Sequence, residues 1–256
     1  MPLQSELADI ANRNGVDFFG VADLAQAADF ILRQGGDFIA RFPICLSIGI
    51  ALPHAIVDLL PRRNERAVQV SYRHHAYDVI NNRLDLAASA LGTRLQKAGH
   101  AAFPIPASER VDDERICASF SHKLGAHLSG LGWIGKSCLL ITPEQGPRVR
   151  WASVLTDAPL SATGASQPDR CGDCMKCVDI CPVRAFTGQH FNCREPREAR
   201  YDAAKCDAYF RSMEQENQMK VCGLCLYICP FGRPSNGTPD RFTPLRVPGP
   251  LPRETR

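Results

Sequence analysis

Two groups of closely spaced cysteines carry most of the chemistry that this sequence could perform. The first group reads C-x2-C-x2-C-x3-C-P, and the second ends in the related pattern C-x2-C-x3-C-P with one further cysteine upstream. The two groups consist of Cys171, Cys174, Cys177 and Cys181, and of Cys206, Cys222, Cys225 and Cys229. This spacing is typical of chains that hold two [4Fe-4S] clusters, in which the last cysteine of a run ligates the other cluster.

We therefore predict two sets of four ligands that cross between the groups. The first set is Cys171, Cys174, Cys177 and Cys229, and the second is Cys206, Cys222, Cys225 and Cys181. Zinc is the alternative, because C-x2-C pairs also form zinc sites. Zinc ribbons usually show two separate pairs, whereas here three cysteines at x2 spacing precede a Cys-Pro. Disulfides are disfavoured because the chain shows no secretory signal pattern.

The composition is that of an ordinary soluble globular protein. The 256 residues are 45% hydrophobic and 22% charged, and 30 Lys plus Arg against 27 Asp plus Glu give a formal net charge of +3. This charge is too small to argue for a nucleic-acid partner. No apolar run reaches the length of a membrane span. Twelve cysteines without a signal pattern indicate metal or redox chemistry in the reducing cytoplasm, with no membrane partner.

Helices and strands should alternate through the first 160 residues and position this chemistry. Hydrophobic periodicity predicts helices over 3–14, 24–34, 72–97 and 114–128, and strands over 16–21, 44–52 and 100–105. Two further strands, 137–142 and 149–156, are expected to pair with each other. The sequence thus predicts an α/β or α+β domain over 1–160, a cluster domain over 161–233 and a Pro- and Arg-rich tail over 234–256.

A glycine-rich loop, Gly130-Leu-Gly-Trp-Ile-Gly-Lys136, precedes the predicted strand pair. It contains G-x-G-x-x-G, but it follows a predicted helix rather than a strand, so it does not match a dinucleotide-binding fingerprint. It also lacks the spacing of a P-loop. By itself, the loop is best explained as a tight connection between a helix and a strand.

The loop and the cysteines together resemble one enzyme family. Arg110-Val111-Asp112, the segment 130–141, the segment 155–160 and the doubled cysteine pattern occur in the order found in epoxyqueuosine reductases. The resemblance extends to their relatives, the iron-sulfur corrinoid enzymes of reductive dehalogenation. It implies a nitroreductase-like domain that binds cobalamin, followed by a bacterial-ferredoxin-like domain with two [4Fe-4S] clusters that delivers electrons to the cobalt.

The resemblance also implies partners. It predicts a low-potential electron donor of the ferredoxin or flavodoxin type and a substrate that is a small molecule or a modified nucleoside. The tRNA-modifying members usually continue into a helical-repeat domain after the second cysteine group. This chain ends soon after that group, which weakens the case for a tRNA substrate.

Site residues follow from the same resemblance. Asp112 falls nearest the family's proton-donating aspartate, and its alternative role is to cap a helix. The loop residues expected against the corrin are Gly132, Trp133, Gly135, Lys136 and Ser137. His122 is a second catalytic candidate, as a proton shuttle or a contact to a corrinoid tail. Its alternative is an ordinary position on a helix face.

We therefore expect an iron-sulfur oxidoreductase that passes electrons through two clusters to a bound cobalamin, which reduces a substrate. Three alternatives remain open. The chain could be a ferredoxin-type electron carrier, a reductase of the corrinoid in a partner protein, or a flavin or nicotinamide enzyme.

Overall fold

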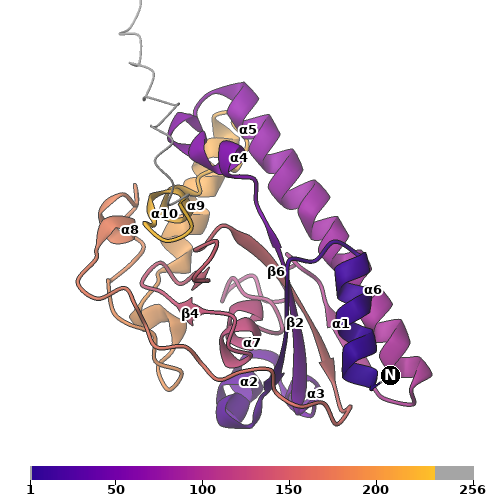
Figure 1. Ribbon diagram of the computed structural model, residues 1–256. Helices are drawn as coiled ribbons and strands as arrows, with labels where there is room; N and C mark the ends of the chain where they lie inside the picture. The colour runs from indigo at the N-terminus through magenta and orange to yellow at the C-terminus, as the bar shows by residue number, and fades with distance from the viewer. Residues whose placement is uncertain (1, 234–256) are drawn as a thin grey trace, which may run out of the picture.

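A four-stranded antiparallel sheet lies at the centre of the computed structural model, which describes residues 2–233 (Figure 1). The strands occur in the order β1 (Phe18–Asp23), β2 (Ile44–Ala51), β6 (Val149–Thr156) and β3 (Ala102–Ile105). The two central strands pair from Ile44 opposite Thr156 to Ala51 opposite Val149. They are buried on both faces, which explains why they read as continuous apolar runs rather than alternating ones.

Helices cover both faces of this sheet. On one face α1 (Leu3–Arg13) lies along α6 (Ile80–Lys97), which packs on β6 and β3 (Figure 1). The apolar stripe of α6 is buried in the largest core, as its three- and four-residue spacing predicts. The other face is covered by α7 (His122–Leu128), which contacts three of the strands, and by α2 (Ala28–Gly35) and α3 (Asp37–Ala40).

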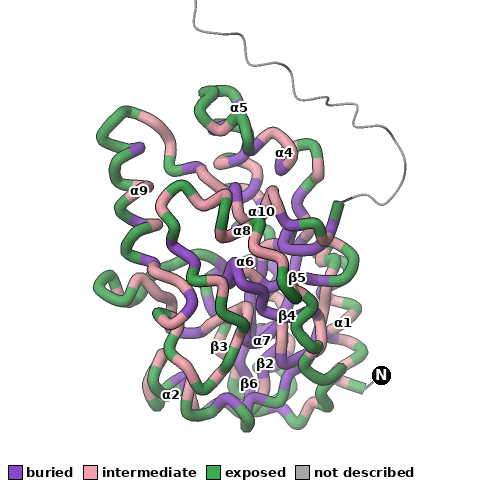
Figure 2. The backbone as a smooth tube through the Cα atoms, turned by 90° about the vertical axis from the view of Figure 1, so that its left-hand side faces the viewer, coloured by how far each residue is buried: buried purple, intermediate pink, exposed green. Residues whose placement is uncertain are grey.

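The segment that carries the cysteines contains short helices joined by loops. These are α8 (Lys176–Asp179), the 3-10 turn Arg197–Ala199, α9 (Ala203–Gln215) and α10 (Leu224–Ile228). The segment does not have a core of its own, since Val221 and Leu226 belong to the same buried cluster as Leu84 of α6. Figure 2 shows the buried backbone gathered around the sheet and α7, with exposed stretches toward the outer elements.

The other elements near the top of Figure 1 lead into α6. They are α4 (His54–Asp58), the 3-10 turn Leu60–Arg62 and α5 (Arg66–Arg73). The predicted helix over 72–97 begins earlier than expected, because α5 continues through a π-helical stretch, His74–Val79, into α6. The predicted helix over 24–34 is divided into a 3-10 turn at Ala25–Ala27 and α2, followed by α3 after Gly36.

Two predicted elements are wrong. The helix expected over 114–128 begins only at His122, because Asp112 and Cys117 form a β-bridge that keeps the intervening residues in a turn. The Ser121 side chain then accepts a hydrogen bond from the Leu124 N–H and caps the short helix.

The second error concerns the strand pair 137–142 and 149–156. Residues Leu140–Ile141 form β5, which pairs with β4 (Trp133–Ile134) instead. Strand β6 already has β2 and β3 on its two edges, so it has no edge left for β5. The predicted tail over 234–256 lies outside the described residues. Among residues 2–233, no helix is both long and apolar enough to cross a membrane.

Candidate iron-sulfur centres and the adjoining cavity

The first predicted ligand set converges on a small hollow between the turn before α8 and the end of α10. Its four cysteines line this hollow together with Lys136, Ser137, Ile141 and Phe231. Burial raises the pKa of the Cys177 thiol to about 12, and the nearby sulfurs of Cys171, Cys229 and Cys174 add to this shift. Cys229 comes from the second sequence group, so the structure brings together the residues of the crossed set.

The second predicted set is drawn from α9, from the segment that leads into α10, and from the end of the first cysteine group. Cys206 lies on α9, Cys222 lies two residues before α10, and Cys225 lies in its first turn. Burial raises the pKa of Cys206, and Cys222 and Cys181 contribute to the shift. Burial likewise raises the pKa of Cys225, with contributions from Cys222, Cys206, Cys177 and Cys181. Cys177 belongs to the first set, so the two groups of thiols are neighbours.

The chemistry of these donors suits iron-sulfur clusters. Thiols that raise one another's pKa repel when ionised, and metal ions relieve this repulsion because the thiolate is the ligand form. In the described part of the chain, no three His, Cys, Asp or Glu side chains converge closely enough to hold a single metal ion. The structure nevertheless brings the eight cysteines near one another in two neighbouring groups, and their role as cluster ligands stays a prediction.

The glycine-rich loop wraps around the first set. Burial raises the pKa of the Cys171 thiol, and the Lys136 backbone N–H and the Trp133 indole N–H oppose this shift. The indole nitrogen has no regular hydrogen-bond partner among the described residues, so it lies near the sulfur without ideal geometry. Such N–H groups tune the potential of a cluster.

Two glycines of this loop allow other segments of the same chain to pack closely against its backbone. A Cβ atom at Gly132 would lie 2.2 Å from the Ile141 carbonyl oxygen, and one at Gly135 would lie 3.1 Å from the Cys171 sulfur. The Lys136 ammonium donates a hydrogen bond to the Gly172 carbonyl at 2.6 Å. Larger residues at these glycines would push the loop away from the cysteine segment.

A second, larger cavity of about 590 Å³ opens beside α7. Its walls come from α7, β5, β6, the turn 115–118 and the segment 191–200. Apolar lining is supplied by Phe120, Leu139, Leu140 and Trp151. The cavity also has a strongly cationic lining, made by Arg33, Arg115, Lys123, Arg150, Arg194, Arg197 and Arg200, against Glu198 as the one carboxylate among its described lining residues.

His122 lies on the wall of this cavity. Its Nδ1 is 3.0 Å from the Ser153 hydroxyl, and its Nε2 is 3.0 Å from the Pro106 carbonyl. The carbonyl can only accept, so Nε2 carries the proton and Nδ1 accepts from Ser153. Burial lowers the pKa of His122 to about 4, so the ring is neutral at pH 7 with both nitrogens engaged. This arrangement suits a positioning role, and the predicted catalytic role stays a prediction.

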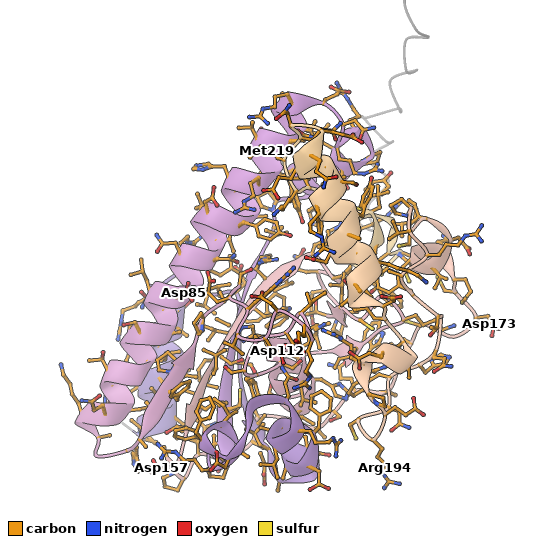
Figure 3. The ribbon with its side chains drawn as sticks, turned by 180° about the vertical axis from the view of Figure 1, so that it is seen from behind. Asp85, Asp112, Asp157, Asp173, Arg194 and Met219 are labelled. Carbon is orange, nitrogen blue, oxygen red and sulfur yellow. The ribbon has the colours of Figure 1, made fainter. Side chains whose placement is uncertain are left out.

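Asp112 lies near the rim of the cavity but is not among its lining residues. Its carboxylate accepts a hydrogen bond from the Arg115 N–H at 2.7 Å and stabilises the turn that ends at Cys117. Figure 3 shows Asp112 near the middle of this face, between Asp85 of α6 and Asp173 of the cysteine segment. Its predicted alternative, a helix cap, is replaced by a turn cap, and its role as a proton donor stays a prediction.

The five loop residues expected against a corrin do not line this cavity. Lys136 and Ser137 line the hollow of the first cysteine set, and Trp133 packs edge-on against Phe231 with ring centroids 4.8 Å apart. Ile134 of the same loop and Cys138, two residues after it, do line the cavity. The loop therefore separates the first cysteine set from the cavity, and contact of the five residues with a cofactor remains a prediction.

The burial of two arginines, Arg148 and Arg200, did not follow from the sequence, although the alternation of Arg148 and Arg150 on a strand was compatible with either a carboxylate contact or an exposed face. Arg148 is fully buried, 3.0 Å from His54 Nδ1 and 2.8 Å from the Asp58 carboxylate, and it lies near Cys229. Arg200 is 4% exposed on the cavity wall. Neither residue lies in a recognisable motif, and only tertiary packing reveals that they are buried.

Comparison with known proteins supports the division into a cysteine segment that binds two clusters and an adjoining α+β region. A family model described as a 4Fe-4S double cluster binding domain matches residues 170–232. Epoxyqueuosine reductases of Pseudomonas aeruginosa and Gloeobacter violaceus are 31% and 37% identical over 120 and 121 residues, which are 42% and 43% of this chain. The enzyme of Cellulophaga algicola is 29% identical over 174 residues, or 64% of this chain. These alignments span 30%, 35% and 50% of the three relatives.

Solved structures share the fold. A reductive dehalogenase, whose description refers to B12-dependent dehalogenation, superposes on 90% of this chain with a TM-score of 0.66 and 18% identity, covering 32% of its own chain. An epoxyqueuosine reductase from Bacillus subtilis superposes on 90% of this chain with a TM-score of 0.57 and 20% identity, covering 65% of its own chain.

The fold and the cysteine groups thus define an iron-sulfur protein, in which a mixed α+β domain adjoins a double [4Fe-4S] cluster segment. The family resemblance predicted from the sequence is confirmed, because the chain is epoxyqueuosine reductase-like in sequence, cluster segment and fold.

Proposed function

We propose that the chain is an oxidoreductase that carries electrons through two [4Fe-4S] clusters to a cobalamin held in the cavity beside α7. The domain over 1–160 would be the corrinoid-binding, nitroreductase-like part, and 161–233 the ferredoxin-like part. A bound corrinoid would supply a strongly reducing cobalt centre for the substrate. The cavity fits such a group in character, since it joins apolar walls to a cationic lining in which the Arg200 guanidinium has unpartnered nitrogens.

The observation that carries this proposal is the adjacency of thiols and cavity. Cys177 of the first set contributes to the raised pKa of Cys225 in the second set, and Cys225 in turn lies near enough to Lys123 of the cavity wall to oppose the lowering of its pKa. The turn of the first set reaches the surface at Asp173, at the edge of the molecule in Figure 3. Electrons from a low-potential ferredoxin or flavodoxin would therefore enter at the first set and leave through the second.

The residues of the cavity have separate tasks in this proposal. Phe120, Leu140 and Trp151 would exclude water and contact the apolar part of the ligand. His122 would hold Ser153 and the cavity wall in place through its two hydrogen bonds. Asp112 would supply a proton from the rim, as the resemblance implies. The substrate is proposed to be a small molecule or a modified nucleoside, and one epoxyqueuosine reductase has been solved with a modified tRNA stem loop.

The test begins with anaerobic reconstitution of the protein with iron and sulfide. Cob(II)alamin is then added, the sample is desalted, and absorbance and EPR spectra are recorded. Two cubanes require about eight irons per chain. Retained cobalamin with a base-off cobalt(II) signal is the expected result. Intact clusters with cobalamin washed away would remove the tight-binding enzyme and favour an electron carrier or a reductase of a partner's corrinoid.

A pair of variants separates electron delivery from binding. Leu140→Arg places a charge in the cavity wall and should abolish cobalamin retention while about eight irons remain. Leu86→Arg is the matched control, because Leu86 is an exposed residue on α6 that does not line the cavity. Equal loss of cobalamin in both variants would argue against this cavity as the binding site.

A further inference from the structure

Arg200 presents an unsatisfied positive group to the large cavity. The residue is 4% exposed, and its Nε and Nη1 atoms have no hydrogen-bond partner among the described residues. Its guanidinium stacks on the Phe191 ring at 4.6 Å, which fixes the plane of the fork. A buried charged donor without an acceptor is destabilising, so an arginine held in this way is suited to binding an anion.

Two further cations surround the same part of the wall. The Arg197 guanidinium donates to the Ile116 carbonyl at 2.9 Å and pairs with Glu198. The Lys123 ammonium donates to the Cys138 carbonyl at 2.7 Å. Burial lowers the pKa of Lys123, and the nearby charges of Arg197 and Arg200 act in the same direction. Mutual repulsion among three such groups falls when an anion enters between them.

The geometry of the donors selects the type of anion. A guanidinium offers parallel N–H groups that match two oxygens of a phosphate or carboxylate. The cavity is large, and its cationic lining extends well beyond these three residues. A group with several acceptor oxygens and a net charge satisfies more of these donors than a single carboxylate does.

We propose that Arg200, supported by Lys123 and Arg197, binds a phosphate group of the ligand that occupies the cavity. This inference rests on the proposed function only to the extent that a ligand enters the cavity beside α7. The phosphate could come from the nucleotide tail of a corrinoid or from a nucleotide substrate, and both would present negatively charged phosphate oxygens to the guanidinium.

Binding of three probes to the reconstituted protein distinguishes these sources. Cob(II)alamin carries the phosphodiester tail, cobinamide has the same corrin ring without that tail, and a nucleoside 5′-monophosphate carries phosphate alone. The variants are Arg200→Met and Arg200→Lys, with Arg13→Met as the control at an exposed position of α1 that does not line the cavity. Iron content and far-UV circular dichroism check that each variant is folded.

If the phosphate belongs to the corrinoid, the wild type binds cobalamin more tightly than cobinamide. Arg200→Met should then weaken cobalamin binding by about 10- to 100-fold and leave cobinamide unchanged. If it belongs to the substrate, both corrinoids bind equally to all variants, and only the monophosphate loses affinity in Arg200→Met. Arg200→Lys should retain part of the affinity, because it keeps the charge without the fork.

Equal affinities of wild type and Arg200→Met for all three probes would overturn the inference, even if cobalamin is retained and the proposed function stands. If neither corrinoid binds the wild type but the monophosphate binds in a way that depends on Arg200, the proposed function is overturned and the phosphate site stands. If the Arg200 variants lose iron, competition on the wild type decides instead. Inorganic phosphate should displace the bound probe at an ionic strength at which chloride does not, and equal displacement would contradict a phosphate site.

Discussion

Arg110 and Asp207 form an ion pair that ties the loop of Asp112 to the helix of a predicted cluster ligand. Asp207 directly follows Cys206 on α9, and Arg110 lies two residues before Asp112. Arg211 pairs with the same carboxylate from the next turn of the helix. The position of the rim of the cavity therefore depends on the helix that carries the second cysteine set.

Replacing Asp207 by Asn should loosen this connection. The hydrogen bond from Arg110 and the nearby positive charges hold the pKa of Asp207 below its usual range, although burial acts in the opposite direction. Loss of the charge-assisted hydrogen bonds should lower the free energy of unfolding by about 2 kcal/mol. Chemical denaturation at pH 7 measures this change, with Glu216→Gln, an exposed residue just after α9, as the control.

The Arg110–Asp207 ion pair also predicts how the stability of the fold changes with pH. Because the folded pKa of Asp207 lies below its unfolded value of about 3.9, its stabilisation is present above that value and is lost as the pH falls through the folded pKa. The difference in stability between wild type and Asp207→Asn should therefore shrink below about pH 4. A difference that stays constant down to pH 3 would argue against the ion pair as the cause.

His122 should make the fold sensitive to mild acid. Burial lowers its pKa to about 4, below the unfolded value, so the neutral ring stabilises the fold above about pH 6.5. This contribution is lost as the pH falls from about 6.5 toward 4. Between pH 7.5 and 5.5 the wild type should lose about 1 kcal/mol more than His122→Gln. The His74 side chain is 70% exposed, so the control variant His74→Gln should behave as the wild type.

The crossed ligand sets predict which cysteines share a cluster. Cys181→Ser and Cys206→Ser should each leave about four irons and the same remaining EPR signal, because both remove a ligand of the second set. Cys174→Ser should leave a different signal. Cys193→Ser, a change of the one other cysteine between the two groups, should keep about eight irons. Matching signals for Cys181→Ser and Cys174→Ser would instead show that each sequence group holds its own cluster.

Trp133→Phe should lower the reduction potential of the first cluster. The change removes an N–H near the Cys171 sulfur while an aromatic ring still packs against Phe231. A regular hydrogen bond of about 0.5–1.5 kcal/mol corresponds to roughly 20–60 mV for a one-electron couple, so this looser N–H contact should shift the potential by no more than that. Redox titration followed by EPR measures the shift. Trp151→Phe is the matched control, since that indole lies on β6 against Phe18.

The sequence predicted the parts whose chemistry is local. The spacing of the cysteines and the apolar stripe from Ile80 to Leu95 depend on residues a few positions apart, and the structure groups or buries them as expected. The burial of Arg200 could not be predicted, because its neighbours Phe191 and Lys123 meet it only in the folded chain.

The wrong predictions also arise from contacts that form only in the folded chain. The pattern after Asp112 suits a helix, but the bridge from Asp112 to Cys117 competes successfully with helical hydrogen bonds. The glycines at 132 and 135 indicated a close approach, and the sequence could not show that the approaching group is Ile141 or Cys171 of the same chain.

Gly146, next to the cavity wall, is in close contact with Phe231, which follows the second cysteine group. Gly146 and Phe231 lie so close that a Cβ at Gly146 would be 2.1 Å from the Phe231 carbonyl oxygen. Phe231 is two residues after Cys229, and Gly146 is next to Pro147 of the cavity wall. Oxygen damage to the proposed first cluster would release Cys229 and should therefore deform the cavity directly. A reconstituted preparation exposed to air should lose added cobalamin before the rest of the chain unfolds.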